Sequence, residues 1–509
     1  MEKNHYEVLI VGAGISGASL AYELARYTDV ESIAVLEKYE DVATLNTSGK
    51  ANSQTIHFGD IETNYTLSKA SITKQTAKMV EKYCLQHKLE NKVMFSHQKM
   101  ALGVGDREVE FMLERYEEFK ELFPNLQVWD KEHLKTVEPK VVFDENGKER
   151  EETIVGIGSI GEWTTVDYGL MTKSLIENAQ KEENTKVDLF LNTQVDDIKK
   201  ADGEELYTVT TTNGETYYAK SIVVNAGAHS LFLAHKMGYG LDFATLPMAG
   251  SFYMTNQKML NGKVYMVQNP KLPFAALHGD PDILENGLTR FGPTALVLPK
   301  LERFKSGTYG DFFKTLNFDA NIVTIFWDLL KDSDIRNYIF RNFLFEIPYL
   351  NKKLFVKDAK KIIPSLNVDE LHYAKGFGGV RPQVLDKKER KLMLGEASIN
   401  TGDGIIFNMT PSPGATSCLG NAKRDVINLC SHLGRNFDEV KFAEELVETN
   451  IPQSLIDEKL QAKYVSEIRA EIHEHEEKYF LNLNDGQELP SYWEKPYSPW
   501  RNKRDHWAM

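Results

Sequence analysis

The chain has 509 residues, of which 42% are hydrophobic and 26% are charged, an ordinary composition for a globular protein. This composition excludes a disordered, collagen-like or coiled-coil chain, and the length predicts two or three domains. The net charge of −14 argues against a general nucleic-acid-binding protein, because phosphate contacts need a basic face.

Cysteine usage and the N-terminal sequence indicate the compartment. Cys84, Cys418 and Cys430 form no CxxC pair, so we expect no disulfide framework, no catalytic metal and a reducing environment. The first residues enter a strand-like run without the apolar core of a signal peptide. No stretch approaches the ~18 apolar residues of a membrane-spanning helix. We therefore expect a cytoplasmic protein that is soluble or membrane-peripheral.

A glycine-rich turn near the N-terminus is the most informative local pattern. Residues 6–11 are a continuous apolar run, typical of a buried parallel strand, and Gly12, Gly14 and Gly17 follow in the spacing GxGxxG before a helical pattern. A second apolar run ends at Glu37, where an acid would meet the ribose of a dinucleotide. The pattern predicts an α/β dinucleotide-binding unit, with the helix N-terminus facing a pyrophosphate.

A second GxGxxG match, at Gly156, Gly158 and Gly161, has a different context. The residues after it favour β-structure where a helix should begin, so we interpret it as a loop or hairpin. Without a second nucleotide-binding unit for NAD(P)H, the electrons are expected to come from a small substrate.

The remaining chain alternates between helical and strand patterns. Residues 66–90 and 105–123 have helical periodicity, whereas residues 186–225 alternate as strands around a hairpin at Asn213-Gly214. More strands are expected in 243–300, and the chain is helical and acidic from about residue 439.

Several sequence blocks resemble malate:quinone oxidoreductases, which are FAD-dependent enzymes of the D-amino-acid-oxidase-like superfamily. The most specific block runs from Asn52 to Thr66 and contains His57. L-2-Hydroxyglutarate oxidases share this block and are the nearest competitors. One departure is that the family pattern P-H-L-D-T-R reads Leu277 to Asp282 here, with Asp282 in place of the Arg. Supporting blocks are Val166 to Gly169, Asn225 to Gly227, Leu246 to Gly250, Phe291 to Pro293 and Ser412 to Ala415.

The resemblance implies an α/β fold with α+β elements, in which a Rossmann-type FAD-binding domain is interleaved with a mixed β-sheet substrate domain. The FAD-binding domain is expected in residues 1–90, 150–235 and 370–435. The substrate domain is expected in 91–149 and 236–369, followed by a helical extension in 436–509.

The resemblance also implies a set of FAD contacts. The glycine turn would serve the pyrophosphate, Glu37 the ribose, and Val195 the adenine through its backbone. Pro413-Gly414 and the small residues after it independently predict an uncluttered helix N-terminus, which suits negative charge on the flavin. The complete predicted set is Gly12, Gly14, Ile15, Ser16, Gly17, Glu37, Lys38, Asn52, Ser53, Val195, Ala226, Gly227, Gly414, Ala415 and Thr416.

Three residues are the candidates for catalysis. Arg381, in the tight turn G-G-V-R-P, is the candidate carboxylate clamp because a guanidinium binds a carboxylate bidentately. His57 is the candidate base, since histidine is the side chain that most often takes up and returns a proton in enzymes. His278 could be either the base or a second carboxylate partner, and the sequence does not decide which histidine has which role.

The resemblance implies oxidation of (S)-malate to oxaloacetate with electron transfer to a membrane quinone. One rival is oxidation of another 2-hydroxy acid, such as L-2-hydroxyglutarate or lactate. A rival of another class is a flavin-binding protein without dehydrogenase activity. Segment 304–355 is rich in aromatic residues, and residues 300–361 hold 12 Lys and Arg against eight Asp and Glu. Segment 304–355 has two interpretations. It is either a patch that binds peripherally to the inner face of the cytoplasmic membrane, or the hydrophobic side of core helices or of a dimer surface.

Overall fold

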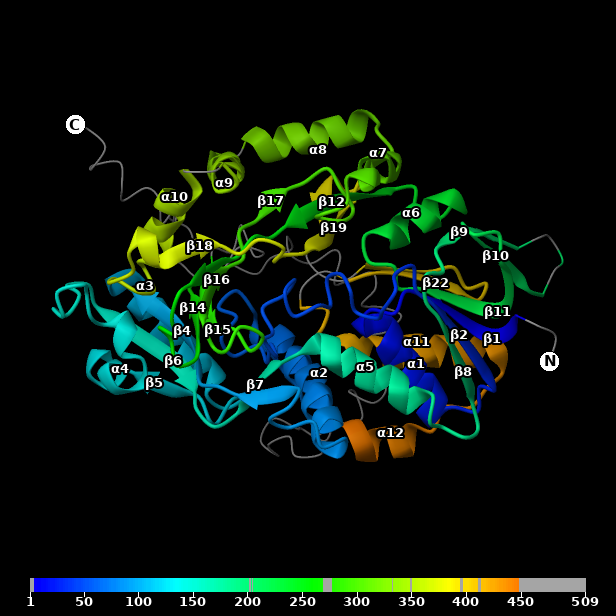
Figure 1. Cartoon of the computed structure of the whole chain (residues 1–509), viewed down its shortest axis with the longest axis horizontal. Helices are drawn as coiled ribbons and strands as arrows, with labels where there is room; N and C mark the ends of the chain where they lie inside the picture. The colour runs from blue at the N-terminus through cyan, green and yellow to red at the C-terminus, as the bar shows by residue number, and fades with distance from the viewer. Residues whose placement is uncertain are drawn as a thin grey trace. The chain divides into compact units, whose positions relative to one another are not determined.

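The computed structural model describes residues 4–200, 203, 205–268, 277–331, 333–347, 350–393, 397–410 and 413–447. Met1–Val447 form one compact unit (Figure 1). Residues 448–509 are a separate unit outside the described residues, and most of the predicted C-terminal helical extension falls there.

A parallel sheet holds the glycine-rich turn. Its strand order β8-β2-β1-β11-β22 is that of a doubly wound nucleotide-binding fold, and β21 adds an antiparallel edge. The central strands β1 and β2 are almost entirely buried, as expected where helices cover a parallel sheet. Their bounds are β1 His5–Val11, β2 Ser32–Leu36, β8 Lys186–Phe190, β11 Thr216–Val224, β21 Ala397–Asn400 and β22 Ile405–Met409.

Three helices form a layer beside this sheet: α1 (Ile15–Tyr27) packs against α5 (Tyr168–Ala179) and α11 (Cys418–Leu433) (Figure 1). α2 (Leu67–Gln86) contacts α11 and α12 (Glu439–Leu446), and α6 (His229–Lys236) packs near β22. The predicted hairpin at Asn213-Gly214 is confirmed, because β10 (Tyr207–Thr211) pairs antiparallel with β11 and then with β9 (Val195–Lys199).

A second group of strands forms mainly antiparallel sheets. Among the described residues one sheet has the order β18-β13-β16-β15-β14-β4-β6-β5, another has the order β17-β12-β19-β20, and β3 pairs with β7. The bounds are β3 Met94–Ser96, β4 Lys99–Val104, β5 Gln127–Trp129, β6 Ile154–Ser159, β7 Trp163–Val166, β12 Phe243–Ala249, β13 Tyr253–Thr255, β14 Lys263–Met266, β15 His278–Pro281, β16 Thr289–Gly292, β17 Leu296–Val297, β18 Leu371–Tyr373, β19 Val380–Asp386 and β20 Lys391–Leu392.

The first two glycines of the second motif, Gly156 and Gly158, lie inside β6 and not in a loop, which corrects the sequence-based interpretation for them, whereas Gly161 lies in the bend between β6 and β7. Gly156 and Gly158 pair with β4 and β5, and a Cβ atom at Gly158 would lie 2.0 Å from the carbonyl oxygen of Lys99. These glycines allow close strand packing, and no helix follows directly. β6, β18 and β19 therefore lie in the antiparallel sheets, although the predicted boundaries placed them with the FAD-binding segments. The division into domains stays a prediction.

The remaining helices flank the antiparallel sheets. α3 (Asp106–Phe119) and α4 (Lys131–Val137) pack near β6, and short 3₁₀ turns span Pro139–Val141, Ser306–Thr308 and Val368–Glu370. α7 to α10 lie together along one side, at the top of Figure 1. Their bounds are α7 Tyr309–Leu316, α8 Ala320–Lys331, α9 Ser333–Leu344 and α10 Leu350–Ala359.

The aromatic residues of segment 304–355 divide into two groups. Phe345 and Phe355 are buried in the core beneath the antiparallel sheet, and Phe312 is buried against β12 and β19. The core interpretation therefore holds for these three residues. Others on α7 to α9 are more than half exposed, among them Phe313, Trp327, Phe340 and Phe343.

Candidate active site

A cavity of about 510 Å³ lies beyond the carboxyl ends of the parallel strands, a size suited to a cofactor with a small substrate. The predicted site residues come together there: all of them except Gly17 and His278 line the cavity. Its other walls come from the loop after β2, from residues 250–252 and 301–305, and from the turn 376–382. The cavity therefore lies between the nucleotide-binding sheet and the antiparallel sheets.

The glycine turn after β1 has the geometry that the pattern predicts. Gly12 has a φ of +102°, and a Cβ atom there would lie 2.5 Å from the carbonyl oxygen of Asn225 after β11. A Cβ atom at Gly17 would lie 2.0 Å from the carbonyl oxygen of Gly12, so glycine is needed for α1 to pack this closely against the turn. Gly14 is the N-cap residue of α1 and has no side chain. Because Gly14, Ile15 and Ser16 line the cavity, the positive end of the helix faces it.

Glu37 directly follows β2 and is buried beside this turn. Its Oε2 accepts a hydrogen bond from the Ala13 N–H at 2.8 Å, and its Oε1 accepts one from the Tyr39 N–H at 3.1 Å. Burial raises the pKa of Glu37 above its ordinary value, and these two hydrogen bonds oppose the rise. The carboxylate fixes the turn and keeps further acceptor capacity for a ribose hydroxyl.

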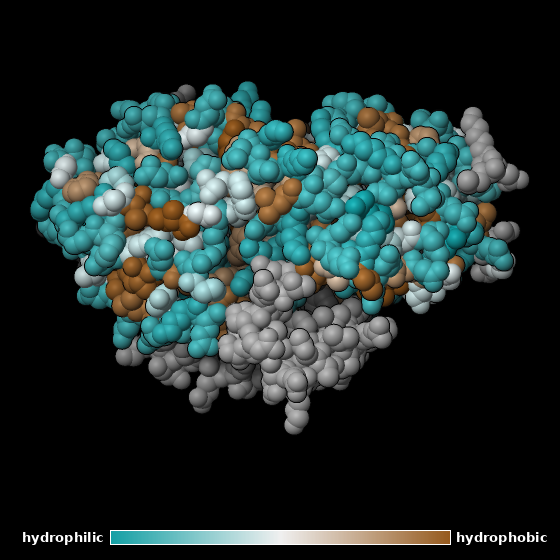
Figure 2. All heavy atoms as spheres, turned by 90° about the horizontal axis from the view of Figure 1, so that it is seen from below, coloured by the Kyte–Doolittle hydropathy of each residue, from teal (hydrophilic) through white to brown (hydrophobic). Residues whose placement is uncertain are grey.

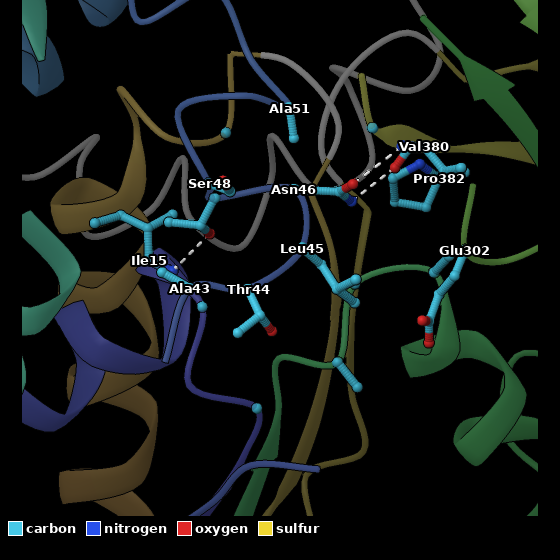
Figure 3. A pocket seen from close by; sticks show the side chains of 18 of the residues that line it. Ile15, Ala43, Thr44, Leu45, Asn46, Ser48, Ala51, Glu302, Val380 and Pro382 are labelled. Carbon is cyan, nitrogen blue, oxygen red and sulfur yellow. Dashed lines mark hydrogen bonds between the residues drawn. The ribbon is translucent and has the colours of Figure 1, made fainter. Parts of the chain in front are cut away.

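A loop of residues 43–52 runs between α1 and the turn that leads into β19 (Figure 3). Thr47 Oγ1 accepts the Ile15 N–H at 3.0 Å, and Asn46 bonds both the N–H and the carbonyl of Val380. Asn52 Nδ2 donates to three carbonyls of this loop, at 2.9 to 3.1 Å. Asn52 thus lines the cavity while its amide holds the loop in shape.

His57 also lines the cavity and is oriented by two contacts. Its Nδ1 lies 2.5 Å from Oε1 of Glu62, and its backbone N–H donates to Thr416 Oγ1 at 3.1 Å. The Nε2 atom lies 3.4 Å from Ser53 Oγ, a residue that also lines the cavity. A histidine with one nitrogen held by a buried carboxylate presents its other nitrogen for proton transfer.

Arg381 reaches the cavity from β19, after the tight turn of Gly378 and Gly379. A Cβ atom at Gly378 would lie 1.9 Å from the carbonyl oxygen of Gly250, and the Gly250 N–H donates to the carbonyl of Gly379. Only glycine fits this approach. The turn places Arg381 opposite Met248 on β12, and Arg381 lines the cavity.

His278 lies behind the cavity wall. Its ring stacks on Tyr265 with centroids 4.5 Å apart, and Tyr265 makes an edge contact with His57. The Nδ1 atom lies 2.8 Å from Asp280, and burial lowers the pKa of the ring below its ordinary value despite that carboxylate. Sequence reasoning placed His278 at the substrate, whereas its position among the described residues is one layer back.

Arg290 and Asp282 form part of the same buried layer. Arg290 pairs with Asp282 at 2.8 Å and with Asp280 at 3.4 Å, and all three side chains are fully buried. The acid that replaces the family's Arg at position 282 is therefore matched by an arginine on the neighbouring strand. This partner could not be found from the sequence, because β15 and β16 meet only in the folded sheet.

A cluster at the other end of the cavity was missed by sequence analysis. Glu302 accepts hydrogen bonds from Lys38 and Tyr39, and His229 lies 3.7 Å from it and 3.5 Å from Asp311. Burial and the Lys38 charge lower the pKa of His229 to about 4. Figure 3 shows Glu302 on the opposite side of the 43–51 loop from Ile15. The cluster ties β2 to the segment that leads into α7.

These residues fit FAD, the cofactor that the resemblance implies. The glycine cradle that a Cβ atom would fill, the N-terminus of α1 with glycine as its N-cap residue, and the acid after β2 match a pyrophosphate and a ribose. Gly414, Ala415 and Thr416 form the turn before α11, which begins at Cys418 and not at the turn itself. Within the described residues no group of three or more His, Cys, Asp or Glu side chains could hold a metal ion.

Comparison with known proteins places the chain in a family. The family model described as malate:quinone oxidoreductase matches residues 4–475. The chain belongs to the malate:quinone oxidoreductase family. A relative named probable malate:quinone oxidoreductase, from Campylobacter jejuni, is 57% identical over 88% of this chain and 100% of its own length. The malate:quinone oxidoreductase of Helicobacter pylori strain 26695 is 48% identical over 87% of this chain and 98% of its own.

More distant similarities agree with the family. A mitochondrial L-2-hydroxyglutarate dehydrogenase from Nematostella vectensis is 27% identical over 82% of this chain and 90% of its own length. Among solved structures, the FAD-bound L-α-glycerophosphate oxidase of Mycoplasma pneumoniae aligns with a TM-score of 0.58 at 22% identity, covering 88% of this chain and 97% of that one. This likeness confirms the predicted fold.

Proposed function

We propose that the chain oxidises (S)-malate to oxaloacetate with bound FAD and passes the electrons to a membrane quinone. The observation that carries this proposal is the family match across residues 4–475, together with a cavity that holds the family's predicted residues. The proposed substrate needs a base for its hydroxyl proton and cations for its carboxylates, and both kinds of group line the cavity.

The chemistry divides between cofactor and protein. Bound FAD supplies the hydride acceptor for the reacting carbon. His57 takes the hydroxyl proton at Nε2, while Glu62 holds the hydrogen on Nδ1 and stabilises the charge that the ring acquires. Arg381 binds the carboxylate beside the reacting carbon and so fixes that carbon in the cavity. The carbon–oxygen double bond of oxaloacetate forms as the proton and the hydride leave.

The test is anaerobic reduction of the bound flavin by a panel of substrates. Bleaching by malate, with little bleaching by L-2-hydroxyglutarate, lactate or NADH, is the expected result. Arg381→Lys keeps the charge but loses the planar fork, so the malate KM should rise and kcat should fall. If L-2-hydroxyglutarate bleached the flavin in preference to malate, we would instead assign this chain the activity for which the Nematostella vectensis relative is named.

We also propose that quinone is reached at the inner face of the cytoplasmic membrane, where the chain would bind peripherally. No helix among the described residues is long and apolar enough to cross a membrane. Val323, Trp327 and Leu330 form an exposed apolar stripe on α8, and Phe340 and Phe343 continue it on α9. The face seen from below, away from these helices, is mostly hydrophilic with separate apolar spots (Figure 2).

A further inference from the structure

Arg303 is a buried cation in the cavity wall, and it has no part in the proton transfer through His57 or in the carboxylate clamp of Arg381. It lies in the loop between β17 and α7, and only 7% of its side chain is exposed. Its Nη2 donates to Ser251 Oγ and to the Tyr373 hydroxyl at 3.2 Å, and lies 3.5 Å from Glu346. Its Nε and Nη1 are enclosed and have no hydrogen-bond partner among the described residues.

Unmet donors on a buried guanidinium need an explanation. An arginine carries five N–H donors, and a buried donor left unpaired costs about 1–3 kcal/mol, more when the group is charged. Native proteins therefore pair such groups with protein, water or ligand. The three partners on Nη2 hold the side chain in place but leave the other two nitrogens unmet. An anionic ligand in the cavity would satisfy them.

The position of Arg303 relative to Arg381 suggests which kind of anion binds there. The Arg303 Nε lies 3.3 Å from the site of a Cβ atom at Gly378, the residue that opens the turn before Arg381. Both arginines line the same cavity. A malate dianion has one carboxylate beside the reacting carbon and a second at its distal end. Two separated cations match two carboxylates.

We propose that Arg303 binds the distal carboxylate of a 2-hydroxy dicarboxylate and so selects dicarboxylates over monocarboxylates such as lactate. This proposal rests on the proposed function, because it takes Arg381 as the clamp for the first carboxylate. It replaces His278 in that role, since His278 does not line the cavity. Glu346 competes with the ligand for Arg303 and partly neutralises the charge of Arg303 when no ligand is bound.

Binding of non-oxidisable acids to the FAD-loaded enzyme tests the proposal. Succinate and propionate are titrated separately, and the change in flavin absorbance gives each Kd without turnover. Arg303→Gln should weaken succinate binding by roughly 30-fold or more, the scale of losing a buried charged partner, and should weaken propionate binding far less. The ratio of kcat/KM for malate to that for lactate should fall in parallel. Arg150→Gln is the matched control, because Arg150 is also buried but bonds to Val141 and Lys361.

A second variant keeps the test decisive if Arg303→Gln does not fold. Glu346→Gln removes the carboxylate that competes for Arg303, so succinate should bind more tightly while propionate changes little. Equal losses for succinate and propionate in Arg303→Gln, or weaker succinate binding in Glu346→Gln, would overturn the proposal. If malate does not reduce the wild-type flavin but succinate still binds through Arg303, the proposed function fails and the dicarboxylate site stands.

Discussion

The imidazole of His57 and the buried carboxylate of Glu62 form a pair, with Nδ1 and Oε1 2.5 Å apart. The second oxygen of Glu62 accepts the Gly59 N–H at 2.8 Å. Burial would raise the pKa of Glu62, but the His57 hydrogen bond and the charges of His57 and Lys99 hold it below its ordinary value. An ionised Glu62 fixes the hydrogen on Nδ1, which leaves Nε2 as the acceptor for a substrate proton.

Glu62→Gln should therefore slow anaerobic flavin reduction by roughly 10²-fold, because the ring loses both its fixed tautomer and the charge that stabilises its protonated form. FAD should remain bound, since Glu62 does not line the cavity. Stopped-flow absorbance measures the rate. Glu108→Gln is the control, because Glu108 is equally buried but pairs with Lys361. A Glu62→Gln rate equal to the wild-type rate, with His57→Gln slow, would rule out the positioning role.

His278→Gln should behave differently from His57→Gln. Because the ring is buried, stacks on Tyr265 and lies beside Asp280, its loss should lower stability by about 1–3 kcal/mol and leave Asp280 with one partner fewer. The flavin reduction rate should fall by less than roughly tenfold, well below the loss expected for a positioned base. Thermal melting and stopped-flow measurements on the same preparation separate the two effects. A large rate loss without a stability loss would return His278 to the chemistry.

The sequence was sufficient where the signal is local. The strand, glycine turn, helix and acid at 6–37 are set by neighbouring residues, as is the hairpin at Asn213-Gly214. It was insufficient where burial depends on distant partners. Arg303 meets Gly378 and Glu346 only in the folded protein, and Phe345 is buried while Phe343, two positions earlier, is exposed. Helical periodicity alone cannot tell which aromatic stripe faces the core.

Glu37→Gln should weaken FAD binding by roughly tenfold or more while leaving the spectrum of the saturated enzyme normal. A glutamine keeps one acceptor oxygen and introduces donors opposite the Ala13 and Tyr39 N–H groups, so both the turn and the ribose contact suffer. The flavin ring should be unaffected, because its predicted contacts lie at the opposite end of the cavity. Flavin retention through dialysis is the measurement, with Glu108→Gln again as control. Equal retention would mean that Glu37 does not contact the cofactor.

Replacing exposed aromatic residues on α7 to α9 should release the protein from membranes. Serine at Phe313, Trp327, Phe340 and Phe343 should reduce liposome binding and quinone reduction, and malate oxidation with a soluble dye should survive. Binding should also weaken with salt, because part of it is electrostatic. Serine at Ile72, Leu85 and Leu170, which are exposed on α2 and α5, is the control. Unchanged liposome binding would assign the stripe to a protein interface.

Protonation of the Glu162 carboxylate in acid should make the protein less stable, because it weakens the contact with Lys99. Lys99 is buried and lies 2.6 Å from Asp60 and 3.2 Å from Glu162, beside the segment that carries His57. Burial raises the pKa of Glu162, but Lys99 and the Ser159 hydroxyl outweigh it and lower the pKa from 4.5 to about 2. A lowered carboxylate pKa stabilises the fold above the unfolded value of 4.5, and that stabilisation is lost as the pH falls towards 2.

The stabilisation from Glu162 should amount to about 2 kcal/mol after solvent screening, because 28% of the side chain is exposed. Glu162→Gln should therefore lower the free energy of unfolding at pH 7 and flatten its decline between about pH 4.5 and pH 3. Denaturant unfolding at a series of pH values gives both quantities. Glu117→Gln, which removes an exposed partner of Lys120, should leave the pH profile unchanged. If Glu162→Gln loses stability in acid as steeply as the wild type, another carboxylate near Lys99 carries the dependence. Glu62 is then the one to replace, because the His57 hydrogen bond and the charges of His57 and Lys99 lower the pKa of that carboxyl as well.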